Sequence, residues 1–541
     1  MTAPLAQGPR LLHELPAHWA ARSPDAEALV SGADRRTWHE LRSRADRLRG
    51  ALRAAGVGRG GRVAVVGRNS ASCLEAVLAA AGAGAATAVL NWRLAPPELA
   101  YVLADSGAEV LFADAALLDP LRTALRDLPA PPSLVVTGTP DAPVTGGAVA
   151  YESLIERAEP LPALDGLDPD DTCVILYTSG TTGFPKGAEL THRGLLEQGA
   201  ALLAVLPLGP EDRSLAVLPF FHVGGVCYAI TTMLAGAPTV VLREPAPDAI
   251  CRAVADGVTH LVLVPAMLPG IMRSGPEAVA AFSRLRHCLY GASPMPLPVL
   301  RRALDLFPRT RFLQLYGMTE VSGAVTALAP EVHRDPAQAH RLTSAGRPLP
   351  GVETRVVDPA TGAAVLPGHR GELWLRTRQR MKGYLGNPAA TAETITEDGW
   401  LRTGDLARVD EDGFVFVEDR LKDLIITGGE NVCPAEVERV LAEHPAVAET
   451  AVIGVPDEKW GESVHAVLAP APGARINAAE LRAHCRERLA GYKCPRSVEV
   501  VEALPRNATG KIDKNALRAA APGPDGTPPE DARPGTASAT G

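Results

Sequence analysis

A strand-like run that leads straight into a glycine-rich loop restricts this chain more than any other feature. The stretch DDTCVILYTSGTTGFPKG places apolar residues before a segment with four hydroxyls, three glycines and one lysine. Glycine lets backbone N–H groups converge, hydroxyls add hydrogen-bond donors, and the lysine adds a point charge. A polar surface loop is the simpler alternative. The density of all three features favours a polyphosphate-binding loop at the end of a strand.

Two familiar phosphate motifs do not explain this loop. A Walker loop needs Gly-Lys-Ser/Thr, but Pro185 precedes Lys186 and Gly187 follows it. A GxGxxG pattern occurs at residues 56–61, but it follows a helix-like stretch and precedes the strand-like RVAVVG. That order is the reverse of a dinucleotide-binding motif, so we interpret Gly56, Gly58 and Gly61 as a helix end and turn.

Helix and strand patterns alternate through the first two thirds of the chain. Thr37 and Glu40 have capping-box spacing before an amphipathic helix, and RVAVVG, EVLFAD and PSLVVTG are strand-like. This alternation predicts α/β architecture with mostly parallel sheets. Beyond residue 340 the chain becomes rich in short strands and turns, and a compact αβ unit follows. We therefore expect a large domain at 1–420, a small domain at 421–520 and a disordered tail at 521–541.

Composition narrows the classes of function and location. The chain has 541 residues and a net charge of −8 without a strong basic block, which argues against nucleic acid as the main partner. Eight scattered cysteines form no CxxC pair, as is typical of reduced thiols in the cytoplasm. The first ten residues do not resemble a signal peptide, and no apolar run reaches the ~18 residues of a transmembrane helix. These features predict a cytoplasmic protein.

A series of ordered motifs resembles the adenylate-forming superfamily of acyl-CoA synthetases, luciferases and adenylation domains. The motifs are YTSGTTGFPKG, LPFFHVGG, YGASPMP, QLYGMTE, SAGRPLPG, WLRTGD, DRLKDLIITGGENVCPAEVE, GYKCP and LPRNATGKI, and fatty acyl-CoA ligases are the most similar members. The resemblance covers about residues 15–518. It implies a large α/β domain with a small β-rich subdomain, followed by a small mobile α+β domain, and it leaves a homodimer open.

The resemblance also implies ATP, Mg²⁺ and coenzyme A (CoA), with an acyl-AMP intermediate. Glu320 would hold Mg²⁺ near Thr319, because hard cations prefer oxygen ligands. Helix capping is the less favoured alternative for these two residues. Without the resemblance, Asp405 could equally be a turn residue, and Tyr316 would be a core residue. The residues implied for ATP and AMP are Thr178, Ser179, Gly180, Thr181, Thr182, Gly183, Lys186, Gly291, Ala292, Ser293, Tyr316, Gly317, Asp405 and Arg420.

The small domain carries the residues that the resemblance assigns to alternation between two half-reactions. Lys511 would bridge the carboxylate and the α-phosphate during adenylation, although a lone lysine near a terminus is usually a solvated charge. Lys422 matches the hinge position, where a few residues absorb a large rotation. The residues implied for CoA are Gly428, Gly429, Glu430, Tyr492 and Lys493.

The implied acyl pocket points to an apolar acid. Amino-acid-activating relatives place an aspartate in the region of PFFHVGGVCY, but this stretch contains no carboxylate, and a buried unpaired ammonium would cost several kcal/mol. Leu315 replaces the glycine or cation of other relatives. His222 matches a gating residue, with core packing as its alternative. The residues implied for the pocket are His222, Val223, Gly224, Leu315, Gly317, Met318 and Gly323.

Three functions remain open at this stage. The favoured one is an acid:CoA ligase for a medium- or long-chain fatty acid, with aryl acids as the alternative substrates. An acyl-AMP ligase that loads a carrier protein is the second, but GGENV and GYKCP favour CoA by resemblance. A non-catalytic nucleotide-binding homologue is the third. The presence of Glu320, Asp405, Arg420 and Lys511 argues against it.

Overall fold

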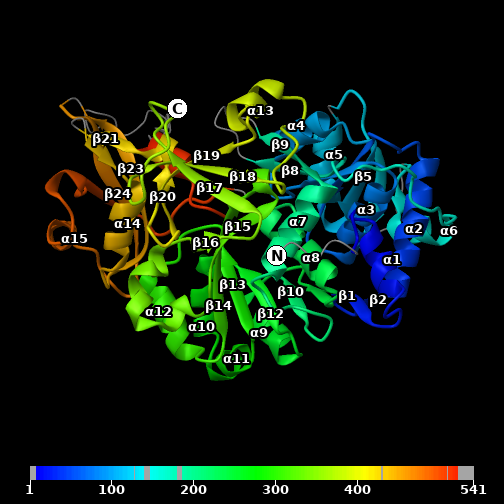
Figure 1. Cartoon of the computed structure of the whole chain (residues 1–541), viewed down its shortest axis with the longest axis horizontal. Coiled ribbons are helices and arrows are strands. Elements are labelled where there is room, and N and C mark those ends of the chain that lie inside the picture. Colours follow the sequence, from blue (N-terminus) through cyan, green and yellow to red (C-terminus); the bar gives the residue numbers. More distant parts are fainter. Residues whose placement is uncertain are drawn as a thin grey trace, which may run out of the picture. The chain divides into compact units, whose positions relative to one another are not determined.

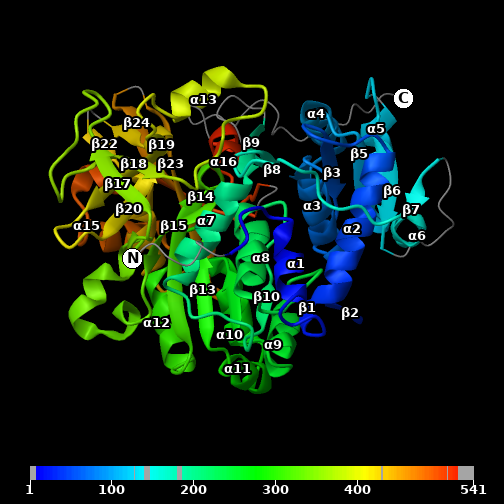
Figure 2. The ribbon, with the colours of Figure 1, turned by 45° about the vertical axis from the view of Figure 1, so that its right-hand side comes forward.

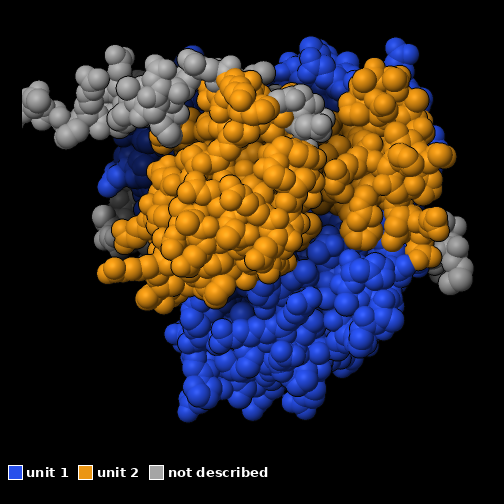
Figure 3. Space-filling model, turned by 90° about the vertical axis from the view of Figure 1, so that its left-hand side faces the viewer, with its two compact units in different colours: residues 1–354, 374–402, 413–415 blue, residues 355–373, 403–412, 416–541 orange. Residues whose placement is uncertain are grey.

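The structure is a computed structural model that describes residues 8–126, 128–138, 147–178, 185–427, 430–457, 459–507 and 510–521. Figures 1 and 2 show the helices and strands coloured along the sequence, and Figure 3 shows the division of the chain into two compact units. Unit 1 comprises residues 1–354, 374–402 and 413–415, and unit 2 comprises residues 355–373, 403–412 and 416–541. The expected domain boundary at 420 falls within unit 2, and it stays a prediction because the two units are a geometric division.

Unit 1 contains a seven-stranded sheet of order β7-β6-β5-β3-β4-β8-β9. All its neighbouring strands are parallel except β8 and β9, which form an antiparallel edge. The strands are β3 (Arg62–Val66), β4 (Ala86–Leu90), β5 (Val110–Asp114), β6 (Ser133–Thr137), β7 (Val149–Ala150), β8 (Thr172–Thr178) and β9 (Lys186–Thr191). The accompanying helices are α2 (Trp38–Ala54), α3 (Ala71–Gly82), α4 (Pro96–Ser106), α5 (Leu118–Arg126) and α6 (Tyr151–Arg157).

A nine-stranded sheet of order β16-β15-β14-β13-β12-β10-β11-β1-β2 completes the framework of unit 1. Its strands are β1 (Glu27–Ser31), β2 (Asp34–Thr37), β10 (Ser214–Ala216), β11 (Thr239–Val241), β12 (His260–Leu263), β13 (His287–Gly291), β14 (Arg311–Met318), β15 (Gly323–Leu328) and β16 (Arg347–Pro348). Its helices are α1 (Glu14–Ala20), α7 (His192–Leu203), α8 (Val223–Ala235), α9 (Pro247–Ala255), α10 (Leu268–Arg273), α11 (Pro276–Phe282) and α12 (Leu297–Leu306). The central strands from β1 to β14 are parallel, so the predicted α/β fold is confirmed.

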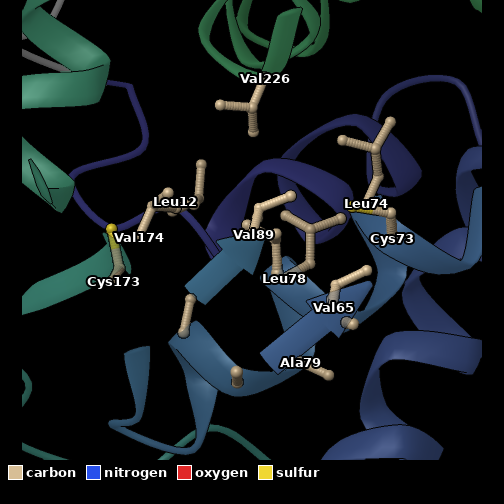
Figure 4. Packing of buried hydrophobic residues seen from close by; sticks show 14 of the residues in the cluster. Leu12, Val65, Cys73, Leu74, Leu78, Ala79, Val89, Cys173, Val174 and Val226 are labelled. Carbon is tan, nitrogen blue, oxygen red and sulfur yellow. The ribbon is translucent and has the colours of Figure 1, made fainter. Parts of the chain in front are cut away.

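One apolar core is shared by the two sheets of unit 1. Val65 on β3, Val89 on β4 and Val174 on β8 pack with helix α3, while Val226 on α8 belongs to the same cluster (Figure 4). Helix α3 is rich in alanine and buried along most of its length. Small side chains let its backbone approach both layers closely, which makes this region sensitive to added volume.

The remaining strands form two smaller sheets. A four-stranded sheet, β17-β18-β19-β20, contributes residues to both units, and helix α13 (Pro388–Thr394) lies between β18 and β19 in sequence. Its strands are β17 (Val352–Val357), β18 (Gly371–Thr377), β19 (Leu401–Val409) and β20 (Val415–Arg420). Unit 2 adds β21 (Ile425–Thr427), β22 (Glu430–Val432), β23 (Val447–Asp457), β24 (Gly461–Pro470) and β25 (Ser497–Val500), with helices α14 (Pro434–Ala442), α15 (Ala478–Arg486) and α16 (Lys514–Ala520).

Several local predictions can be compared with these elements. The Thr37–Glu40 capping box is present at the start of α2, and Gly56, with φ of 89°, follows the end of that helix. Pro434 is the first residue of α14, as its position in the sequence predicts. The stretch NAAELRAHCRERLAG predicts a helix that ends at Gly491, but α15 ends at Arg486, because the N–H groups of Arg488 and Leu489 both bond to Cys485 O.

The tail expected to be disordered lies, from residue 522 on, outside the described residues. None of the helices in the described part of the chain combines the length and apolar character that a bilayer-spanning segment needs. All eight cysteines are buried and form no disulfide.

Candidate functional site

The predicted phosphate loop closes the hairpin between β8 and β9 at the edge of the seven-stranded sheet. Thr178 is the last residue of β8, Lys186 is the first of β9, and the two are register partners. The predicted loop residues Ser179, Gly180, Thr181, Thr182 and Gly183 lie outside the described residues. The structure therefore brings together the two ends of the loop, and with them the lysine that the sequence singles out.

Residues 381–385, here called the strap, connect this hairpin to a second predicted motif. Glu189 N donates to Gly383 O and Leu385 N donates to Gly187 O, so the strap runs beside β9. Met381 N donates to Glu320 O at 2.7 Å, which ties the strap to the QLYGMTE segment as well. The strap thereby places the start of β9 next to the predicted metal ligand.

Glu320 lies in a 3-10 turn directly after β14 and is buried, with 7% of its surface exposed. Its Oε1 accepts a hydrogen bond of 2.8 Å from the Tyr384 hydroxyl. The Lys186 Nζ lies 5.3 Å from the centre of the same tyrosine ring, within the range of a cation–π contact. A lysine, a tyrosine and a carboxylate from three separate segments therefore form one cluster in unit 1.

Close backbone approaches explain two of the predicted glycines. A Cβ on Gly317 would lie 1.8 Å from Gly323 O, and a Cβ on Gly291 would lie 2.3 Å from Leu315 O. Both glycines therefore allow β14 to sit tightly against its neighbouring segments. Thr319 begins the turn that carries Glu320, and Tyr316 and Met318 are half-buried on β14.

Ala292 and Ser293 follow β13 at the same edge of the sheet. Ala292 adopts φ of 67°, which non-glycine residues seldom do. A left-handed residue at a strand end turns the chain sharply, and such outliers concentrate at ligand sites. The strained turn fits the predicted wall of a nucleotide site, because it occurs where parallel strands end.

The predicted acyl-pocket residues converge on the first turn of α8 and the end of β14. His222 precedes α8 and its ring centre lies 4.7 Å from that of Phe221; Val223 and Gly224 begin the helix. Leu315 packs against an apolar cluster made of Leu202, Leu206, Leu218, Tyr228, Val262, Leu289 and Leu313. Gly323 begins β15 with φ of 125°. The cluster around Leu315 can accept an apolar group, and the described residues 219–228 include no carboxylate that could pair with an ammonium.

In unit 2, the two predicted ribose-binding residues contact each other. Arg420 Nε lies 2.7 Å from Asp405 Oδ1, and Arg420 Nη1 donates to Thr403 O. Asp405 is 3% exposed, whereas the Arg420 side chain is about half exposed. The arginine therefore fixes one oxygen of a buried carboxylate on β19, the orientation that a bidentate acceptor of two hydroxyls needs.

The predicted hinge and CoA residues occupy several parts of unit 2. Lys422 lies in the 3-10 turn Leu421–Asp423, where only its backbone is described. Gly428 and Gly429 lie outside the described residues, and Glu430 begins β22. Tyr492 is 39% exposed. Lys493 instead forms a 2.7 Å ion pair with Glu436 of α14, a contact that sequence reasoning missed.

The turn after Lys422 is anchored to the last helix. Arg518 of α16 pairs with Asp423 at 2.7 Å, and Lys514 pairs with Glu438 at 2.8 Å. The predicted catalytic Lys511 is exposed and lies in a turn closed by Asn507, whose N–H donates to Lys511 O and whose Oδ1 accepts from Lys511 N. These hydrogen bonds use the backbone of Lys511 and both the backbone and the side chain of Asn507.

A basic, aromatic pocket in unit 1 was not predicted. It has a volume of about 150 Å³ and is lined by Arg68, Asn69, Trp92, Arg93, Val217, Pro219, Arg243, Glu244 and Pro245. These residues follow the C-terminal ends of β3, β4, β10 and β11. Ligands of open α/β sheets usually bind at such ends.

Two arginines of this pocket lie beside one indole ring, and one of them, Arg68, also pairs with Glu244 at 3.4 Å. The guanidinium carbons of Arg68 and Arg93 each lie 5.0 Å from the Trp92 ring centre, and Arg93 also lies 5.7 Å from the Phe221 ring centre. Arg243 pairs with Asp114 at 2.7 Å. Guanidinium groups beside an aromatic face can bind phosphate and a stacked base together. In the sequence, the only indication of this pocket is the tryptophan–arginine pair of the NWRL stretch directly after β4.

The described residues contain no group of three or more His, Cys, Asp or Glu side chains arranged to hold a metal ion. Mg²⁺ in nucleotide sites is commonly held by one or two carboxylates together with substrate phosphates and water. The buried carboxylate of Glu320 beside the phosphate-loop hairpin fits that kind of donor set.

Unit 1 has the architecture of a nucleotide-binding enzyme, with two mostly parallel sheets, the phosphate-loop hairpin and the Glu320 turn. A small α+β unit is added to it. The model for the AMP-binding enzyme family matches residues 16–385, and the model for the AMP-binding enzyme C-terminal domain matches residues 436–511. The chain belongs to the AMP-binding enzyme family, as its motifs predicted.

Relatives in this family differ in the acid named for them. The chain is 41% identical over 515 residues to the feruloyl-CoA synthase of Amycolatopsis sp, covering 93% of this chain and 97% of that one. It is 36% identical over 504 residues to the fatty acid–[acyl-carrier-protein] ligase ScoC of Streptomyces coeruleorubidus, covering 92% and 94%. The o-succinylbenzoate coenzyme A synthetase of Bacillus subtilis, solved with ATP and magnesium ion, has a TM-score of 0.80 and 30% identity, covering 93% and 99%.

Proposed function

We propose that this protein is an ATP-dependent ligase that joins an apolar monocarboxylic acid to CoA. The observation that carries the proposal is the cluster of Lys186, Tyr384 and Glu320, which unites the phosphate-loop hairpin with a buried carboxylate. Family membership adds the reaction type, because the matched models describe AMP-binding enzymes.

In the first half-reaction, a carboxylate oxygen of the acid attacks the α-phosphorus of ATP, and pyrophosphate leaves with the electron pair of the broken P–O bond. Lys186 is assigned to the β- and γ-phosphates, and Lys511 to the charge that develops around the α-phosphate. Glu320 would hold Mg²⁺, which supplies charge neutralisation to the phosphates. Asp405, oriented by Arg420, would accept the ribose hydroxyls.

In the second half-reaction, the thiol of CoA attacks the acyl carbon, the thiol proton is lost, and AMP leaves. The arginines around Trp92 support CoA as the acceptor, because its nucleotide carries both phosphates and an adenine base. We assign the gate between the acyl and thiol channels to His222, next to Phe221 at the edge of this pocket. Rotation of the small domain about Lys422 would exchange Lys511 for the CoA-binding residues.

The acid is proposed to be apolar because Leu315 packs against a cluster of buried apolar residues and the stretch from 219 to 228 has no carboxylate. Medium- or long-chain fatty acids and aryl acids both meet this requirement. The named acids of relatives include both types, a feruloyl acid and fatty acids. A cytoplasmic location is part of the same proposal, since ATP and CoA are intracellular substrates and the eight thiols are unpaired.

The test is a screen of purified enzyme with ATP, Mg²⁺ and CoA against octanoate, palmitate, benzoate, cinnamate, malonate and several amino acids. We expect acid-dependent pyrophosphate release and a thioester with at least one apolar acid. The highest kcat/KM then separates fatty from aryl specificity. Pyrophosphate release that ignores added acid would exclude a ligase, and a preference for malonate or an amino acid would refute the pocket assignment.

The carrier-protein alternative needs a second measurement. Hydroxylamine traps acyl-AMP as a hydroxamate whether or not CoA is used. An enzyme that forms hydroxamate but no acyl-CoA would be an acyl-AMP ligase for another acceptor. Lower KM for CoA in the native protein than in Arg93→Gln, at equal rates of acyl-AMP formation, would assign the arginine pocket to the CoA nucleotide.

A further inference from the structure

Tyr384 stands between two groups of the candidate ATP site that have opposite charge. Its hydroxyl donates a 2.8 Å hydrogen bond to Glu320 Oε1, and its ring faces the Lys186 ammonium at 5.3 Å. The sequence pattern gave no indication of this role, because MKGYLG is read as a turn-rich stretch.

The backbone fixes the position of this tyrosine on both sides. Tyr384 forms an antiparallel bridge with Ala188, and its backbone N–H donates a 2.9 Å hydrogen bond to Thr391 Oγ1. The neighbouring strap residues bond to Gly187 and Glu189 of β9. These bonds fix the ring of Tyr384 relative to the hairpin that carries Lys186, while its hydroxyl contacts Glu320 in the turn after β14.

We propose that Tyr384 is a positioning residue that couples the phosphate-loop lysine to the carboxylate that holds Mg²⁺, a role that rests on the function proposed above. The hydroxyl orients Glu320, and an oxygen that accepts one hydrogen bond keeps further lone pairs for a hard cation. The ring face holds the Lys186 ammonium at the end of the hairpin while its N–H groups stay available to phosphate oxygens.

The two halves of Tyr384 have separable consequences. Removing only the hydroxyl removes the hydrogen bond to Glu320. The half-saturating Mg²⁺ concentration should then rise by about tenfold, which is the lower end of the range for groups that orient a metal ligand. The Lys186 contact survives, so binding of metal-free ATP should change less than about twofold. Removing the ring as well should weaken the binding of metal-free ATP by about two- to fivefold, as expected for a lost cation–π contact.

The experiment compares the native protein with Tyr384→Phe, Tyr384→Leu and the control Tyr177→Phe. Tyr177 lies on β8 of the same hairpin, and its hydroxyl donates a 2.6 Å bond to Asp105, so the control also removes a tyrosine–carboxylate bond. Calorimetry measures the affinity for ATP in EDTA and in saturating Mg²⁺. A Mg²⁺ titration of acid-dependent ATP–pyrophosphate exchange gives the half-saturating metal concentration for each variant.

We expect Tyr384→Phe to lose the advantage that Mg²⁺ gives to ATP binding and to keep native affinity in EDTA, while Tyr177→Phe matches the native protein in both. A Tyr384→Phe variant with a native Mg²⁺ response would overturn the inference. Equal losses with and without Mg²⁺ would do so too, because they would indicate a structural role. Absence of acid-dependent exchange in the native protein would instead refute the proposed function, and the calorimetry would still test Tyr384.

Discussion

The substitution Asp405→Asn tests the assignment of the ribose site most directly. Asp405 is almost fully buried, and its Oδ1 is paired with Arg420 Nε at 2.7 Å. Asparagine has nearly the same shape, but it carries no charge and has a single acceptor oxygen. The variant therefore keeps the packing of β19 and removes one charged acceptor.

The expected effect on folding is small, and the expected effect on ATP is large. The Arg420 side chain is about half exposed, so water can replace its partner and the loss of stability should stay near ~1 kcal/mol. A hydrogen bond to a charged group contributes about 1.5–3 kcal/mol. Losing one such bond to a ribose hydroxyl corresponds to about a ten- to hundredfold fall in kcat/KM for ATP.

Steady-state kinetics with varied ATP, together with thermal unfolding, measure both effects. Both half-reactions should suffer, because acyl-AMP retains the ribose. Glu372→Gln is the matched control: Glu372 Oε1 accepts from Gly404 N at 2.9 Å, and glutamine can make the same bond. If Asp405→Asn lowers stability but leaves kcat/KM for ATP within twofold of the control, Asp405 is a turn residue and the ribose assignment is wrong.

Three further results are expected. Lys511→Ala should lose about 10²–10³ in acyl-AMP formation yet convert supplied acyl-AMP and CoA at a near-native rate, measured by separate half-reaction assays, and an equal loss in both halves would contradict its assignment. Truncation after Ala521 should leave kcat unchanged, whereas truncation after Leu517 should lower it several-fold, since it removes the partner of Asp423; equal activity would show that this ion pair is dispensable. Burial lowers the pKa of His192 to about 4, so between about pH 6.5 and 4 the unfolded chain binds a proton that the folded chain does not, and the free energy of unfolding falls as pH drops. Thermal unfolding of His192→Asn across this range should show a smaller fall in stability than the native protein shows.

The sequence predicted the strands, helices and motif positions better than it predicted contacts between motifs. Periodicity and capping located α2, β3 and β8, because both depend on residues that are close along the chain. The Lys186–Tyr384–Glu320 cluster joins segments that are separated by more than sixty residues, so no local pattern could reveal it. Likewise, the Lys493–Glu436 pair depends on how helix α14 packs, which the GYKCP motif does not record.

The acyl pocket shows the same division between local and long-range information. The sequence shows that residues 219–228 around His222 include no carboxylate. A buried substrate ammonium would therefore have no partner in this stretch. The space beside Leu315 depends instead on residues such as Leu202 of α7 and Leu313 of β14. A residue's volume is known from its type, but the space left beside it is set by tertiary packing.

The burial of all eight cysteines makes the protein unusually suitable for site-specific labelling. Burial raises the pKa of the Cys73 and Cys433 thiols to about 12 and that of Cys485 to about 11, so the reactive thiolate is scarce at neutral pH. A maleimide dye should therefore react with an introduced surface cysteine long before it reaches a native one. A donor placed in one unit and an acceptor in the other, without removing any natural cysteine, would report the distance between the units during each half-reaction.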